Sequence, residues 1–398
     1  MEPLHACTAV TRSYLAHARV LARSVLRHHP DGRLAVLVTD DLDGLLDGSG
    51  EPFELLQPSD LPLSRAEFRR MATIYDHKEL ACALKPWVLR AALGGGIDAA
   101  VWLDSDLELF GPIDDLAELG AASEIVLTPH RLEPSTTYVP QYGLFNSGVA
   151  AVGQRSSPLL DWWCERLRWN RVGPYKRFWN QIWLDAVPCW FPGHTILRDP
   201  AVNVAKWNLE ERELVWTESG YEVDGRSLRI FHYSGIHSRP RHRALLDHPA
   251  ASRLCHEYLE RLSADGFEEC RRVRYGFGRT AGGLELARPF RRFLRDVFLL
   301  AEQRQVHALI DPFEADGAER LAAWLVRPMV RRASSLRGLT TEGRAMRVAR
   351  RGALRLAGRR WDYERELERA MLEALRELEA VAGTAAEPSF AAVTWASG

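Results

Sequence analysis

The sequence predicts an α/β protein with a mixed, mainly parallel sheet flanked by helices, followed by a C-terminal helical region. Short apolar runs alternate with helix-spaced apolar residues over roughly the first 240 residues, as in parallel sheets with helices on both faces. Strand-like runs disappear after about residue 245. Two acids, Asp104 and Asp106, directly follow an apolar run, and open α/β sheets bind ligands at the carboxyl ends of their strands.

The individual elements follow from the spacing of apolar side chains. The predicted strands cover residues 5–10, 34–38, 53–56, 99–103, 124–127, 148–152 and 228–232. The predicted helices cover residues 14–28, 75–93, 250–262, 290–309 and 362–381. A glycine run at 94–96 is expected to end the long second helix.

Composition narrows the class of protein. A chain of 398 residues predicts two domains, and a net charge of -1 gives no field that would attract nucleic acid. Six scattered cysteines without a CxxC pair predict reduced thiols in a cytoplasmic setting rather than disulfides or a zinc site. We expect no secretion leader and no membrane span, because no charged-then-apolar segment opens the chain and no apolar run reaches 18 residues.

The acids after the fourth predicted strand suggest a chemistry. Carboxylates such as Asp104 and Asp106 can hold a hard divalent cation, and that cation can clamp a diphosphate. This is the chemistry of nucleotide-sugar transfer. The alternative is a solvated turn, and a second Asp-x-Asp, Asp41 and Asp43, also follows an apolar run.

Two further segments suggest nucleotide binding. The turn after the first strand ends in Tyr14, whose ring and neighbouring backbone amides can hold a base; the alternative is helix packing. Lys85 precedes Pro86 on the helix before the acids. It can contact a diphosphate or brace Asp104, or it can be a surface lysine before a proline kink.

Two later segments suggest sugar and metal binding. Asn146 and Ser147 precede Gly148 just before an apolar strand, which suits hydrogen bonds to sugar hydroxyls or marks a simple turn. His232 ends the last strand. Neutral imidazole is a good third ligand for Mn²⁺, although a lone histidine is more often structural.

The order of these pieces resembles that of the GT-A glycosyltransferases, especially the retaining enzymes of family 8 and related bacterial transferases. The resemblance covers roughly residues 4 to 240. Its motifs are Tyr14, Glu79 with Leu84-Lys85-Pro86, Leu103-Asp-Ser-Asp106, Phe145-Asn-Ser-Gly148, Trp179-Asn-Gln181, Asn203-Val-Ala-Lys-Trp-Asn208 and His232-Tyr-Ser-Gly235.

The resemblance implies a role for each matching residue. Asp104, Asp106 and His232 would ligate Mn²⁺ or Mg²⁺, and Asn146 and Gln181 would contact the donor sugar. The residues implied in nucleotide binding are Val10, Thr11, Tyr14, Lys85, Ser105 and Arg239. The implied reaction transfers a hexose from a UDP-sugar, with retention, to an acceptor that is a glycan, lipid, peptide or natural product.

The chain departs from the family pattern at several positions. Thr11 and Arg12 stand where relatives often carry an acid that reads uracil, and Asn180 replaces a frequent Asp. Ser238 stands where a Lys is usual, and Arg239 follows it. These changes leave a non-catalytic sugar-nucleotide-binding or assembly subunit as the alternative function. A nucleotidyltransferase ranks last, because no Gly-rich basic loop follows the first strand.

The expected domains follow the change in pattern. Residues 1–245 form the transferase domain, 246–330 a helical accessory segment, 331–383 an Arg-rich and amphipathic helical region, and 384–398 a disordered tail. The stretch 327–360 is dense in Arg with one acid, Glu342. It suggests contact with anionic lipid or a polyanionic acceptor, or a solvated helical face.

Overall fold

The computed structural model describes residues 2–40, 46–134, 142–169, 180–237, 243–303, 310–327, 330 and 360–382. The chain divides into two compact units. The first contains residues 1–71 and 75–276, and the second contains residues 72–74 and 277–398. The domain boundaries expected from the sequence stay predictions. Most of the Arg-rich stretch and the whole predicted tail lie outside the described residues.

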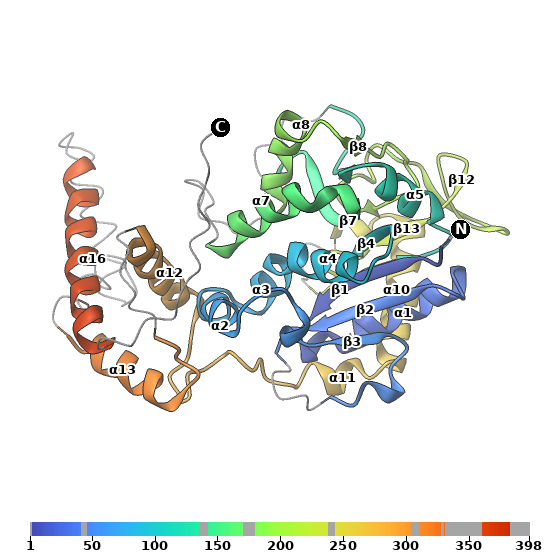
Figure 1. Cartoon of the computed structure of the whole chain (residues 1–398). Coiled ribbons are helices and arrows are strands. Elements are labelled where there is room, and N and C mark those ends of the chain that lie inside the picture. The colour runs from blue at the N-terminus through green and yellow to red at the C-terminus, as the bar shows by residue number, and fades with distance from the viewer. Residues whose placement is uncertain are drawn as a thin grey trace. The chain divides into compact units, whose positions relative to one another are not determined.

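A seven-stranded sheet forms the centre of the first unit, in the order β3-β2-β1-β4-β7-β6-β8 (Figure 1). Strands β3, β2, β1 and β4 are parallel, and β7 runs antiparallel to both β4 and β6. The prediction of a mixed, mainly parallel sheet is therefore confirmed. The strands are β1 His5–Val10, β2 Arg33–Val38, β3 Glu54–Leu56, β4 Ala99–Leu103, β6 Ile125–Pro129, β7 Phe145–Gly153 and β8 His194–Ile196.

Helices flank this sheet. Side chains of a strand alternate between its faces, and Ala6 and Val10 of β1 share a buried core with α1 and α10. Helix α4 packs on β1 and β4, and α5 on β4 and β7. The helices of this unit are α1 Leu15–His28, α2 Arg65–Ile74, α3 His77–Ala83, α4 Lys85–Gly94, α5 Asp114–Ala122, α7 Ser157–Arg168, α8 Val187–Trp190, α9 Arg243–Leu246, α10 Pro249–Ala264 and α11 Phe267–Cys270.

The single helix predicted at 75–93 is wrong, because the chain forms α3 and α4 there. Asp76 caps α3 by accepting from the backbone amides of Lys78 and Glu79. Pro86 lies in the first turn of α4, where its missing N–H needs no partner. The break places Lys85 at the start of α4 rather than in the middle of a long helix.

A small second sheet places the strand that contains His232 beside the predicted acids. It consists of β5 Leu107–Leu109, β13 Ile230–His232 and β9 Val204–Ala205. Strand β13 pairs antiparallel with β5, with His232 opposite Leu107. His232 therefore lies beside the turn that joins β4 to β5. A third sheet contains β10 Leu214–Thr217, β11 Gly220–Val223 and β12 Arg226–Ser227.

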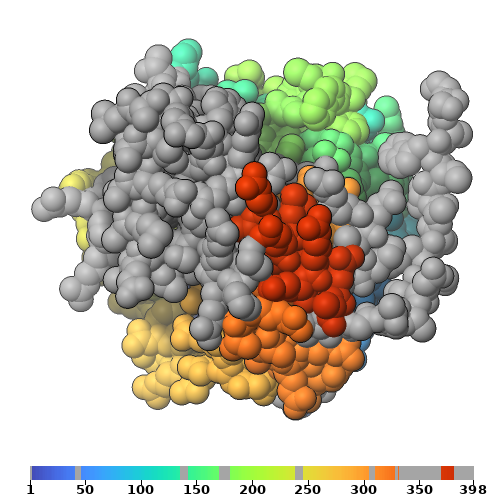
Figure 2. Space-filling view, turned by 90° about the vertical axis from the view of Figure 1, so that its left-hand side faces the viewer, coloured from blue at the N-terminus to red at the C-terminus, as the bar shows by residue number. Residues whose placement is uncertain are grey.

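Helices make up most of the described part of the second unit, as expected. Its helices are α12 Arg288–Gln303, α13 Ala315–Leu325 and α16 Arg360–Ala382. Helix α16 packs against α12 and α13, and the red surface of α16 borders the orange surface of α13 in Figure 2. The indole of Trp324 stacks on Phe293 and donates to the Ala374 carbonyl at 2.8 Å. Among the described residues, no helix is both long and apolar enough to span a bilayer.

Candidate functional site

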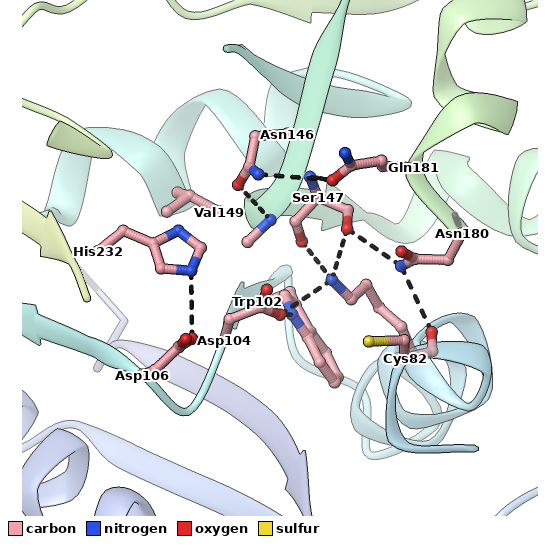
Figure 3. Close-up of polar contacts among 12 residues, drawn as sticks. Cys82, Trp102, Asp104, Asp106, Asn146, Ser147, Val149, Asn180, Gln181 and His232 are labelled. Atoms are coloured by element: carbon pink, nitrogen blue, oxygen red, sulfur yellow. Dashed lines mark hydrogen bonds and ion pairs between the residues drawn. The ribbon is translucent and has the colours of Figure 1, made fainter. Parts of the chain in front are cut away.

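The two acids and the late histidine converge at the rim of the main sheet. One ligand atom from each of Asp104, Asp106 and His232 lies within 4.8 Å of the others. The Nε2 atom of His232 is 3.1 Å from Oδ1 of Asp106, and Figure 3 draws this contact as a dashed line. The Tyr233 backbone amide donates to the Asp106 carbonyl at 2.9 Å, which fastens β13 to the acid-bearing turn.

This donor set fits a divalent cation. Ligand bonds of about 2.0–2.6 Å join ligand atoms about 4–5 Å apart through one ion, and carboxylates and neutral imidazole are both ligands of divalent metal ions. Burial alone would raise the pKa of Asp106, but the adjacent His232 imidazole and its hydrogen bond lower that pKa to about 2. Asp106 is therefore ionised at neutral pH.

Lys85 braces the first acid. Its side chain is fully buried, and Nζ lies 3.0 Å from Oδ1 of Asp104. The ammonium also donates to the hydroxyl and carbonyl oxygens of Ser147, and Trp102 Nε1 donates to the same Asp104 oxygen at 2.7 Å. The surface-lysine interpretation is wrong. Two donors, the Lys85 ammonium and the Trp102 indole, therefore hold Oδ1 of Asp104; Trp102 and Asp104 are labelled in Figure 3.

The Asn-Ser-Gly segment lies within strand β7 rather than in a turn before it. Asn146 pairs with Thr128 of β6, next to a register shift in that ladder. A Cβ atom on Gly148 would lie 2.6 Å from Oδ1 of Asn146 and 2.7 Å from Cε1 of His232. The glycine therefore allows the His232 ring to approach the strand.

The two predicted sugar-contacting amides meet at a histidine that the sequence did not single out. The amide nitrogens of Asn146 and Gln181 each lie 3.2 Å from Nε2 of His130. Gln181 also donates to the Tyr142 carbonyl at 2.8 Å. His130 directly follows β6, which runs parallel to β4, so the strand-end rule that selected Asp104 would have found it.

The predicted nucleotide turn has its own anchor. Asp40, at the end of β2, accepts from the backbone amides of Arg12 at 2.8 Å and Gly276 at 3.2 Å. The Tyr14 ring stacks on His17 at 4.6 Å, and Thr11 shares a hydrogen bond with the Ser13 hydroxyl. The turn after β1 is thereby tied to the next strand.

The remaining predicted residues are placed as follows. Val10 is buried at the end of β1, and Ser105 is half-buried between the acids. Asn180 donates to the Ser147 hydroxyl at 3.0 Å and to the Cys82 carbonyl. Outside the described residues lie Arg239, Ser238, Trp179, Asp41 and Asp43.

Similarity searches give distant relatives. No family model matches the chain. The protein YfnF of Bacillus subtilis (strain 168), described as uncharacterized, is 24% identical over 247 residues, which are 58% of this chain and 80% of that protein. YfnD of the same organism, also uncharacterized, is 24% identical over 257 residues, 59% of this chain and 79% of that one.

Solved structures give loose matches. The galactosyltransferase LgtC in complex with donor and acceptor sugar analogs has 17% identity and a TM-score of 0.40, over 66% of this chain and 96% of that one. The glycosyltransferase GlyE of Streptococcus pneumoniae TIGR4 has 14% identity and a TM-score of 0.38, over 67% and 63%. At these TM-scores, no residue role is transferred from either protein.

Proposed function

We propose that this chain is a metal-dependent glycosyltransferase that moves a sugar from a nucleotide-sugar to an acceptor. The observation that supports it is the cluster of two carboxylates and one imidazole within 4.8 Å at a strand end. A UDP-hexose donor and retention at the anomeric carbon are the expected details, and they rest on the motif resemblance.

In this proposal, the chain's own residues bind and orient the donor. Asp104, Asp106 and His232 would hold Mn²⁺ or Mg²⁺, which supplies positive charge against a leaving diphosphate. The amides of Asn146 and Gln181 would line the sugar's reactive face while the acceptor approaches from the side of the leaving group. Lys85 acts through Asp104, because its ammonium is buried against that carboxylate.

The nucleotide half of the site is proposed at the end of β1. Val10, Thr11 and Ser105 would offer backbone groups, and Tyr14 would stack on the base. Arg239 would neutralise phosphate with its forked guanidinium, in place of the missing lysine. The proposed setting is cytoplasmic.

The test is a panel of nucleotide-sugars incubated with and without Mn²⁺, following release of the nucleoside diphosphate. Asp104→Asn and Asp106→Asn should each cost several kcal/mol of transition-state stabilisation, about 10²- to 10⁴-fold in rate. Asp161→Asn is the matched control, because Asp161 pairs with Arg90 on an exposed helix face. Wild-type turnover by both site variants in EDTA would refute the metal assignment.

A non-catalytic binder is the second candidate, supported by Asn180. Its amide nitrogen donates inward to Ser147 and Cys82, whereas a carboxylate there would accept hydrogen bonds. Mn²⁺-dependent binding of a nucleotide-sugar without turnover, across the whole donor panel, would favour this function over transfer.

The Arg-rich stretch 327–360 supports a proposal about the acceptor side. Clustered arginines attract anionic lipid surfaces through charge that salt screens. We expect the full chain to sediment with vesicles containing phosphatidylserine at low salt and to be released at high salt. Failure to sediment at low salt would refute the proposed membrane contact.

A further inference from the structure

A continuous chain of hydrogen bonds runs from the candidate metal ligand into the protein. His232 Nδ1 lies 3.0 Å from Asn203 Oδ1, and Asn203 Nδ2 lies 3.2 Å from Asn146 Oδ1. Asn146 Nδ2 lies 3.2 Å from His130 Nε2, and His130 Nδ1 lies 3.1 Å from the Gly143 carbonyl. All four side chains are buried. Figure 3 shows two of them, His232 and Asn146.

Backbone groups fix the direction of every bond in this chain. The Gly148 N–H lies 2.8 Å from Oδ1 of Asn146 and can only donate, so that atom is the amide oxygen. Asn146 Nδ2 must then donate to His130 Nε2. The Gly143 carbonyl can only accept, so the proton of His130 lies on Nδ1.

Gln181 adds a second donor to the same imidazole nitrogen. Its amide nitrogen is identified by the bond to the Tyr142 carbonyl, and it lies 3.2 Å from His130 Nε2. A proton on Nε2 would face two N–H groups. Burial of the ring lowers the pKa of His130 to about 3. His130 is therefore a neutral acceptor that joins the two predicted sugar-contacting amides.

The same donor and acceptor assignments determine which nitrogen of His232 donates to Asn203. Because Oδ1 of Asn146 is an acceptor, Asn203 must donate with Nδ2 and present Oδ1 to His232. His232 therefore donates from Nδ1, and its Nε2 faces Oδ1 of Asp106 at 3.1 Å. A proton shared between these two atoms in the metal-free chain, or a bound metal ion in its place, balances the charge of the carboxylate.

The backbone conformation of Asn203 is unusual for a residue other than glycine. Asn203 is fully buried, with a φ of 58° in the left-handed region. Asp224 is the other non-glycine residue with positive φ in the described part of the chain. Asn tolerates the left-handed region better than most residues other than glycine, so this residue type supplies both the backbone conformation and the amide that contacts His232 and Asn146.

We propose that Asn203 and His130 are positioning residues: they hold His232 as its Nδ1–H tautomer, with Nε2 free for the metal, and align Asn146 and Gln181. The proposed metal ligand and the proposed sugar-contacting amides thus belong to one hydrogen-bond network in which every donor and acceptor is fixed. The inference rests on the proposed function for the identity of the ligands, but the proton on each Nδ1 is a property of the metal-free chain.

The first experiment measures that tautomer. Long-range ¹H–¹⁵N spectra of the metal-free, histidine-labelled full chain at about pH 8, above the ordinary histidine pKa of about 6.5, distinguish the two ring nitrogens. His232→Gln and His130→Gln assign the signals. The expected result is a proton on Nδ1 of both rings, and an Nδ1 atom without a proton in either ring would overturn the proposal.

The second experiment measures Mn²⁺ affinity by electron paramagnetic resonance. Asn203→Gly keeps a backbone compatible with positive φ but removes the amide, and should weaken Mn²⁺ binding about 10- to 100-fold. Asp224→Gly is the matched control for the same substitution at the other positive-φ position, and should bind as wild type does. Equal Mn²⁺ affinity in the two folded variants would overturn the role of Asn203.

A third pair of variants isolates His130. Gln places an amide oxygen near the position of Nε2, whereas Asn places its amide near Nδ1 only. We expect His130→Gln to retain the KM for the donor sugar and His130→Asn to raise it; the reverse order would overturn the alignment role. Should wild-type chain bind no Mn²⁺, the proposed function fails, and the tautomer spectrum still decides this inference.

Discussion

The charge of Lys85 is fully buried, whereas the side chain of its partner Asp104 is 27% exposed. Without the carboxylate, the ammonium is buried with no partner charge. Without the ammonium, the carboxylate is still in contact with water. Breaking a buried pair by deleting one partner costs about 3–5 kcal/mol. We predict that cost for Asp104→Asn and a smaller one for Lys85→Met, measured by urea unfolding.

The double variant Lys85→Met with Asp104→Asn tests whether the cost of Asp104→Asn comes from the unpaired charge of Lys85. It should be more stable than Asp104→Asn alone, because no uncompensated charge remains buried. A double variant less stable than both single variants would contradict the pairing.

His130 makes stability depend on pH. Its pKa is about 3 in the folded chain because of burial, against about 6.5 when unfolded. The unfolded chain thus gains the proton first, so the His130 contribution is complete above about pH 6.5 and falls by about 1.4 kcal/mol per pH unit below it. The difference in unfolding free energy between wild type and His130→Gln should shrink from pH 7 to pH 5; a constant difference would contradict this.

At the residue scale, the sequence selected side chains whose chemistry is visible in a short motif. Asp104 and Asp106 follow an apolar run, and His232 ends one, so each could be placed at a strand end in advance. The bracing of Asp104 by Lys85 and the place of His130 after a strand were also within reach of the sequence. The role of Asn203 was not, because it depends on a left-handed backbone, and the orientation of His130 was not, because it depends on the Gly143 carbonyl.

At the element scale, strand β7 tolerates no side chain at Gly148. Overpacking of a filled interior costs about 1–3 kcal/mol, and a Cβ there would displace the His232 ring at 2.7 Å. We predict that Gly148→Ala lowers stability by that amount and weakens Mn²⁺ binding, measured by thermal unfolding and by titration. Gly94→Ala, with no atom within 4 Å of the added Cβ, lies in helix α4 and should keep or slightly raise stability and leave Mn²⁺ binding unchanged; equal losses in the two variants would refute the steric argument.

Each element that the sequence did not predict has its own physical reason. Strand β5 has three residues, too few for a periodic pattern, and it forms because β13 pairs with it across the sequence. Helix α2 has a capping box of Ser64 and Glu67 that is visible in the sequence, but its charged residues hide the apolar face. The break between α3 and α4 was signalled by Pro86, which the helical spacing around it obscured.

At the scale of the whole molecule, Arg291 is the buried cation of the second unit. Its guanidinium donates to the carbonyls of Ala72, Thr73, Phe277 and Leu286. Leaving buried carbonyls without a donor costs about 1–3 kcal/mol each. We predict that Arg291→Met lowers the unfolding free energy by about 3 kcal/mol or more, whereas the exposed Arg320→Met, which loses a pair with Asp316, changes it by about 0.5 kcal/mol or less. Similar losses in both variants would count against this role.

Residues 72–74 lie within the first 276 positions of the chain but count with the second unit. Translation proceeds from the N-terminus, so this short piece is synthesised some 200 residues before Arg291, the side chain that satisfies its carbonyls. Ala72 and Ile74 are fully buried in the finished protein, and domains otherwise tend to fold in the order of synthesis. A nascent chain stalled near residue 276 should therefore occupy holdase chaperones, whereas a longer chain in which Arg291 has cleared the ribosomal exit tunnel should not.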